Sequence, residues 1–134
     1  MKDAAELCMG LIRKASSDRL AMEASLSAQA LDAACFHAQQ MAEKYPKAFL
    51  AERGVPFPYT HNLTKLIELA AGIDNAFRSL LPTVAPLTPY AVELRYDDSF
   101  WPSQQVAEAA RASALAVQRF VLDRLPPAIG KSAQ

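Results

Sequence analysis

Four polar residues follow one another at helical spacing in the first half of the chain. They are a histidine, a glutamine and two lysines separated by steps of three, four and three: His37, Gln40, Lys44 and Lys47. This spacing places a ring, an amide and two ammonium groups along one flank of a helix, where they can bind an anion. An ordinary solvated face, on which Glu43 lies between the lysines, is the alternative, and spacing alone favours it.

A second group lies in the segment 95–101, whose sequence is Arg-Tyr-Asp-Asp-Ser-Phe-Trp. Arg95 can hold a phosphate or a carboxylate with two hydrogen bonds, and the neighbouring aromatic rings can stack on a base. Alternatively, the loop only clamps helix ends, with Arg95 paired to Asp18, an acid at an apolar position of the first helix. The residues leave both interpretations open.

The common catalytic motifs are absent from the sequence. It contains no glycine-rich phosphate loop, no zinc-ligand spacing and no nucleophile motif, and its two histidines, His37 and His61, are too few for most metal sites. Asp97 and Asp98 can contribute to a magnesium site, but adjacent acids are ordinary in loops. We therefore expect neither a metal nor a cofactor.

The elements that carry these residues are expected to be helices, because apolar residues recur with a period of 3.6 and no stretch alternates as a strand does. The expected helices cover 3–26, 31–53 with a kink at Pro46, about 62–72, two short pieces within 74–94, and 103–125. Short connections then give an all-α, up-and-down bundle of four to five helices. The chain, 1–134, is expected to be a single domain with its core at about 3–125 and a flexible tail at 126–134.

Composition limits the partners of such a bundle. The 14 basic and 14 acidic residues cancel, so binding to nucleic acid requires a local patch. Cys8 and Cys35 are expected to be buried, reduced thiols, and the absence of a leader or a long apolar run predicts a cytoplasmic protein without membrane contact. A second apolar stripe on the outer helix faces predicts a homodimer: Met9, Leu20, Phe36, Leu115 and Leu122.

Three sequence segments together resemble the pattern of HEPN domains. They are AACFHAQQMAEK at 33–44, THNL at 60–63 and RYD at 95–97, and their order and spacing also agree. Residues of the first helix match the opening of that pattern, so the resemblance covers about 10–125: Lys14, Ala15, Asp18 and Leu20. Two departures are Tyr45-Pro46, in place of an uninterrupted helical step, and Asp97, where a proline is common.

The resemblance implies a bundle of four to five helices that often forms a symmetric dimer. It also implies nucleotide or RNA binding and, in many members, a metal-independent ribonuclease toxin silenced by a nucleotidyltransferase antitoxin encoded beside it. The nuclease members carry an arginine followed after four to six residues by a histidine. Arg95 opens the comparable region, but no histidine follows it in this sequence, so the usual nuclease pair is incomplete.

Three hypotheses follow. The leading one is a non-catalytic HEPN module of toxin-antitoxin type that engages a nucleotide, RNA or a nucleotidyltransferase through Lys44, Lys47, His61, Arg95, Tyr96 and Asp97. The second is a metal-independent ribonuclease that uses His61 or His37 with Arg95. The third is a purely structural dimer, in which Asp18 and Arg95 form an internal brace.

Overall fold

In the computed structural model, residues 2–129 are described, and they form helices joined by turns, with no strand among them. The elements, in chain order, are α1 (Ala4–Ser27), α2 (Leu31–Glu52), α3 (Leu63–Ala71), the 3₁₀ helix η1 (Asn75–Leu80), α4 (Leu81–Val84), the 3₁₀ helix η2 (Ala85–Tyr90) and α5 (Gln104–Leu122). The all-α bundle is therefore confirmed. Of the expected tail, residues 130–134 lie outside the described residues, whereas Ile129 packs against the core.

Polar side chains mark the beginnings of three helices. Asp3 accepts a hydrogen bond from the backbone N–H of Glu6, and Glu6 accepts one from the backbone N–H of Asp3, which closes a capping box on α1. Asn62 caps α3 and Ser103 caps α5 in the same manner. At the end of α2, Gly54 adopts a φ of +68°, a conformation that costs little only for glycine.

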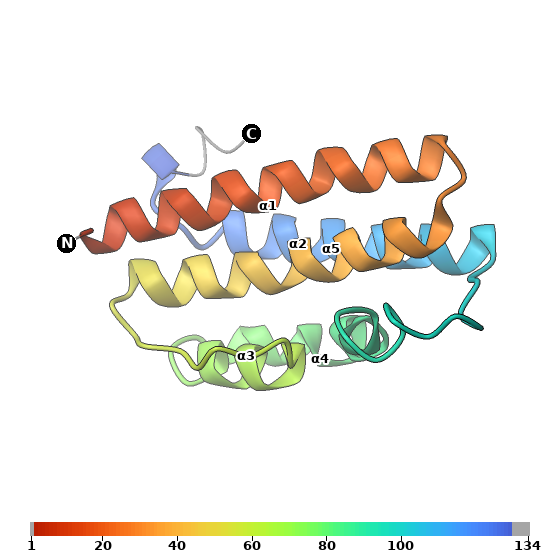
Figure 1. The fold of residues 1–134 in the computed structure, drawn as a ribbon. Coiled ribbons are helices and arrows are strands. Elements are labelled where there is room, and N and C mark those ends of the chain that lie inside the picture. Colours follow the sequence, from red (N-terminus) through yellow and green to blue (C-terminus); the bar gives the residue numbers. More distant parts are fainter. Residues whose placement is uncertain (1, 130–134) are drawn as a thin grey trace.

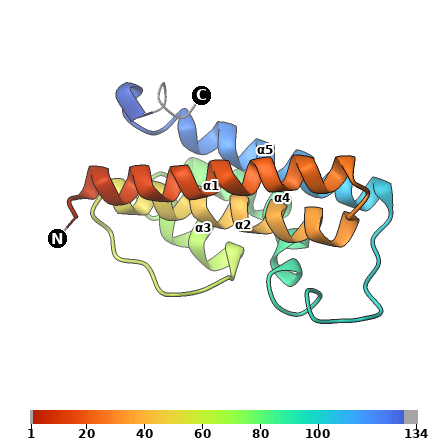
Figure 2. The ribbon, with the colours of Figure 1, turned by 45° about the horizontal axis from the view of Figure 1, so that its top comes forward.

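Helix α2 is the centre of the bundle. In Figures 1 and 2, α1 and α5 lie against it, and the short helices cover its remaining side. Because neighbours surround it, buried residues occur on nearly every side of α2. Pro46, where we expected a kink, lies inside this helix, which continues to Glu52. The colours of Figure 1 show that α5 runs beside α2 in the same direction, since the intervening segment carries the chain back to the end where α2 begins.

The core joins small residues of the long helices to a row of aromatic rings. The ring centroids of Phe49 and Phe77 lie 4.6 Å apart, and those of Phe77 and Phe120 lie 4.9 Å apart, so α2, η1 and α5 meet there. The buried hydroxyl of Tyr45 accepts a hydrogen bond from Gln118 Nε2 at 2.9 Å, which ties α2 to α5. These contacts bury the interior without leaving the Tyr45 hydroxyl unpaired.

The expected outer stripe is only partly exposed. Leu20 is 74% exposed, but Leu122 is buried and Leu115 packs against the core, so α5 does not present the apolar face that we expected. Cys8 and Cys35 are free and buried, as predicted. None of the helices within residues 2–129 combines the length and hydropathy needed to cross a bilayer.

Candidate functional site

A polar network runs along α2 and begins at Asp18 of α1. Asp18 Oδ1 lies 3.0 Å from His37 Nδ1, and Asp18 Oδ2 accepts a short hydrogen bond from Lys44 Nζ. Lys44 also contacts Gln40, whose amide donates to Gln39 Oε1 at 2.7 Å. The inward acid at position 18 therefore has two partners on α2, and the alternative in which it pairs with Arg95 is not what the structure shows.

The second half of the network centres on Glu43, which is only 4% exposed. Its carboxylate accepts hydrogen bonds from Lys47 Nζ at 2.9 Å, His61 Nδ1 at 2.7 Å and Gln39 Nε2 at 3.2 Å. The same Gln39 amide group donates to the backbone oxygen of His61 at 3.2 Å. Gln39 thus links the two halves, and the connection between α2 and α3 is held to α2 by the Gln39 amide and the Glu43 carboxylate.

Burial and hydrogen bonding act on Glu43 in opposite directions. Burial alone raises its pKa. The hydrogen bonds from Lys47 and His61 and the charge of Lys47 lower the pKa by more than burial raises it, so the net pKa lies below the usual value. Glu43 is therefore ionised at neutral pH. One of the two lysines that we expected to bind an anion, Lys47, is mostly buried and already paired with this carboxylate.

A cleft lies where the start of α2 meets the segment from η2 to residue 100. It has a volume of about 360 Å³. Its chemically distinctive lining residues are an arginine, a histidine, an acid and three aromatic rings: Arg95, His37, Asp32, Phe36, Tyr90 and Phe100. The cleft brings His37 and Arg95, which are 58 positions apart in sequence, to the walls of one hollow.

Arg95 is exposed and lies among aromatic rings. Its guanidinium carbon is 4.2 Å from the ring centroid of Phe36 and 5.4 Å from that of Tyr96. Within residues 2–129, no ion pair involves Arg95. The rings of Tyr90 and Phe100, which also line the cleft, stack with centroids 5.5 Å apart. The arrangement leaves a guanidinium available to an anion beside flat apolar walls.

The other candidate residues do not line the cleft. Asp97 accepts hydrogen bonds from the hydroxyl and backbone N–H of Ser99, which hold its pKa below the usual value, so this acid stabilises its own turn. Tyr96 is largely exposed and does not line the cleft, and Lys44 is engaged by Asp18. His61 lies with Glu43 in the other half of the network, and its side chain is 40% exposed.

The cleft contains a guanidinium group and a histidine whose ring is held by Asp18. The Asp18 carboxylate lies 3.0 Å from His37 Nδ1, and this contact fixes the orientation of the imidazole ring. Sequence reasoning treated Phe36 as part of an outer stripe and did not select Asp32 or Tyr90. Among residues 2–129, no three histidine, cysteine, aspartate or glutamate side chains cluster as metal ligands.

Comparison with known proteins identifies the class of this helical bundle. The family model described as the HEPN domain matches residues 9–125, nearly the whole chain. The protein therefore belongs to the HEPN family, which confirms the resemblance seen in the sequence. No curated protein and no solved structure matches the chain significantly.

Proposed function

We propose that this HEPN protein binds a nucleotide, or a nucleotide unit of RNA, in the cleft between α2 and the segment 90–100. The observation that carries this proposal is the position of Arg95, whose guanidinium has no ion pair within residues 2–129, lies over the ring of Phe36 and lines the same cleft as His37. The phosphate of a nucleotide can bind the guanidinium of Arg95, and its base can stack on an aromatic ring of the cleft. Lys44 and Lys47 then hold the scaffold together instead of contacting the ligand.

Titration calorimetry with nucleoside monophosphates and a short single-stranded RNA tests this proposal. Arg95→Ala is expected to weaken binding about tenfold or more, because it removes a charge-assisted hydrogen bond to the phosphate. Arg78→Ala is the matched control, since Arg78 is exposed on η1 and lies outside the cleft. Equal affinity of the wild type and Arg95→Ala would refute the cleft assignment. Binding of neither ligand would leave a role with a protein partner, such as a nucleotidyltransferase antitoxin.

A metal-independent ribonuclease is the second candidate, and one observation favours it. His37 and Arg95 line the same cleft, so a histidine and an arginine share one hollow although the usual sequence pair is incomplete. Asp18 supports the chemistry by fixing the ring of His37. His61 is not among the residues that line this cleft, so within one subunit His37 is the candidate base.

An RNA cleavage assay with metal chelated distinguishes the enzyme from the binding module. If the protein is a ribonuclease, His37→Ala abolishes cleavage, Asp18→Asn lowers it, and His61→Ala leaves it nearly unchanged. Cleavage that persists in His37→Ala, or that is lost only in His61→Ala, rules out this pair as the catalytic groups. If the wild type does not cleave RNA, the ribonuclease hypothesis is refuted and the cleft is assigned to binding only.

The homodimer and the cytoplasmic location remain parts of the proposal. The exposed Leu20 on α1 supports a self-association surface. Leu122 of α5 is buried and so cannot contribute to that surface. Sedimentation at several concentrations tests it: a dimer that dissociates in Leu20→Asp supports α1 as the interface, and a monomer throughout refutes it.

A further inference from the structure

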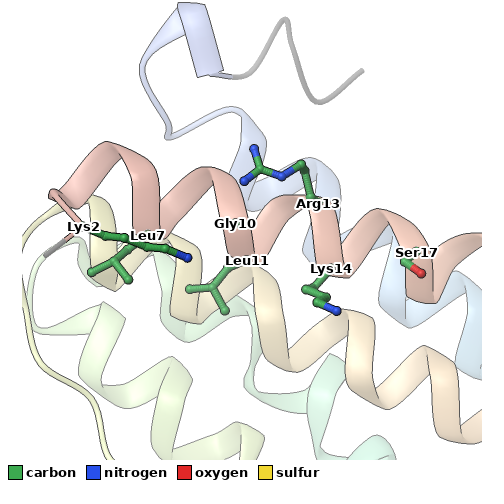
Figure 3. A pocket seen from close by; sticks show the side chains of 7 residues that line it. All are labelled: Lys2, Leu7, Gly10, Leu11, Arg13, Lys14 and Ser17. Atoms are coloured by element: carbon green, nitrogen blue, oxygen red, sulfur yellow. The ribbon is translucent and has the colours of Figure 1, made fainter.

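The first half of α1 carries a groove that neither the polar network nor the cleft uses. Its volume is about 590 Å³. Three cations, two leucines, a glycine and a serine line it, as Figure 3 shows: Lys2, Arg13, Lys14, Leu7, Leu11, Gly10 and Ser17. In Figure 1 this part of α1 lies at the opposite end of the α1–α2 hairpin from the start of α2, where the cleft is.

The groove is a local positive patch on a chain that is neutral overall. No acidic residue lines it, and Lys2, Arg13 and Lys14 form no ion pair within residues 2–129. The acid of the first turn, Glu6, is engaged with the backbone of Asp3. Three cations that form no ion pair, two from the first half of α1 and one from the residue before its cap, favour an anionic partner.

An apolar hollow adjoins these cations. It has a volume of about 530 Å³ and shares Leu7 and Leu11 with the cationic groove. Its other walls come from the start of α1, the end of α2 and the chain after it: Ala4, Ala51, Val55, Pro56 and Phe57. Leu7 is 46% exposed, so a partner can still remove much of its apolar surface from water.

Gly10 lies between the cations and has no structural reason within the chain to be glycine. It is inside a helix, its φ is not positive, and an added Cβ would meet nothing nearer than Arg13 Nη2 at 4.0 Å. Glycine inside a helix is less stable than alanine there. A bare backbone at this point does, however, allow another chain to approach α1 closely.

We propose that the α1 groove binds an acidic amphipathic helix of a partner protein. Apolar side chains of that helix pack over Leu7 and Leu11, and its carboxylates face Lys2, Arg13 and Lys14. A helix with apolar residues on one stripe and acids on its flank fits both hollows at once. A nucleic acid fits less well, because its phosphates leave the aliphatic hollow uncovered and the cationic groove has no aromatic ring for a base.

Fluorescence anisotropy with a labelled synthetic peptide tests the proposal. The probe is a helical peptide of about 15 residues, roughly four turns, with leucines at helical spacing and glutamates beside them. The comparison peptide has lysines in place of the glutamates. The wild type is expected to bind the acidic peptide about tenfold or more tightly than the basic one, and added salt is expected to weaken this binding.

Two variants locate the peptide on the protein. Gly10→Phe fills the groove without changing charge, and Arg13→Glu with Lys14→Glu reverses two cations. Each is expected to weaken binding of the acidic peptide about tenfold or more. Lys65→Glu is the matched control, because Lys65 is an exposed lysine on α3 and lies outside the groove. Circular dichroism and thermal melts establish that each variant is folded before its affinity is compared.

Several outcomes overturn the proposal. Equal binding of the two peptides, or full affinity in Gly10→Phe, removes the groove as the site. Loss of peptide binding in Arg95→Ala assigns the peptide to the nucleotide cleft instead. If a ten-nucleotide RNA binds and depends on Arg13 and Lys14 while the peptide does not bind, the groove serves nucleic acid. Conversion of a dimer to a monomer by Gly10→Phe shows that the groove is covered by a second copy.

Discussion

Glu43→Gln tests whether the buried half of the polar network stabilises the bundle. The substitution keeps the shape of the side chain but removes the negative charge that faces Lys47 Nζ at 2.9 Å and His61 Nδ1 at 2.7 Å. The side chain of Lys47 is only 10% exposed, so its ammonium group cannot recover full hydration where it lies. An unpaired charge in such a place is costly.

The size of the effect follows from this burial. Removing one partner of a buried ion pair costs about 3–5 kcal/mol, and the amide oxygen of glutamine retains one acceptor, so we expect a loss of about 2–4 kcal/mol. Urea denaturation at pH 7, followed by circular dichroism, measures this loss in the free energy of unfolding. Glu23→Gln is the control, because the pair of Glu23 with Arg111 is about 38% exposed and contributes less than about 1 kcal/mol.

The pH dependence provides an independent check. Because the pKa of Glu43 is lower in the folded chain than its ordinary value of 4.5, its contribution is fully present above that value. It is lost as the pH falls through the lower pKa of the folded state. The stability difference between the wild type and Glu43→Gln should therefore shrink on acidification. A difference no larger than that of the Glu23→Gln control at pH 7, or one that grows in acid, would refute the reasoning.

Three further predictions concern the backbone and the thiols. Gly10→Ala is expected to raise the free energy of unfolding by about 0.5–1 kcal/mol, because the added Cβ lies inside a helix and meets nothing nearer than Arg13 Nη2 at 4.0 Å; a loss in urea denaturation would contradict this. Gly54→Ala is expected to lower it by about 1–2 kcal/mol, because a φ of +68° strains alanine; unchanged stability in the same assay would contradict this. Burial raises the pKa of Cys8 and of Cys35 to about 11, so a disulfide reagent at pH 8 should label them only in denaturant, and rapid labelling of the folded protein would disprove their inaccessibility.

The helices could be predicted because their signals are local. A capping residue acts on the N–H groups two or three positions ahead, and the apolar period repeats within a few turns, so Asn62 and Ser103 indicate helix starts without tertiary information. The long helices accordingly begin and end close to the expected positions. The proline-rich segment was harder, because prolines exclude a long helix but do not select among the short forms seen in η1, α4 and η2.

The site was less predictable because it depends on how helices are rotated against one another. Asp18 was recognisable as an inward acid, but its choice of His37 and Lys44 over Arg95 depends on the packing of α1 on α2, which no local pattern encodes. Gln39 and Glu43 were missed for a related reason. An amphipathic pattern assumes one buried face, whereas α2 has neighbours on several sides, so polar residues opposite the apolar stripe are buried as well.

The central position of α2 also has a consequence for the order in which the chain folds. Its contacts with α1 join segments separated only by a short turn at residues 28–30, so little loop entropy opposes them. Its contacts with α5 close a much longer loop that contains α3, η1, α4 and η2. Contacts of short sequence separation form sooner than distant ones. We therefore expect the α1–α2 hairpin to form before α5 packs against it, so amide protons of α5 should gain protection after those of the hairpin.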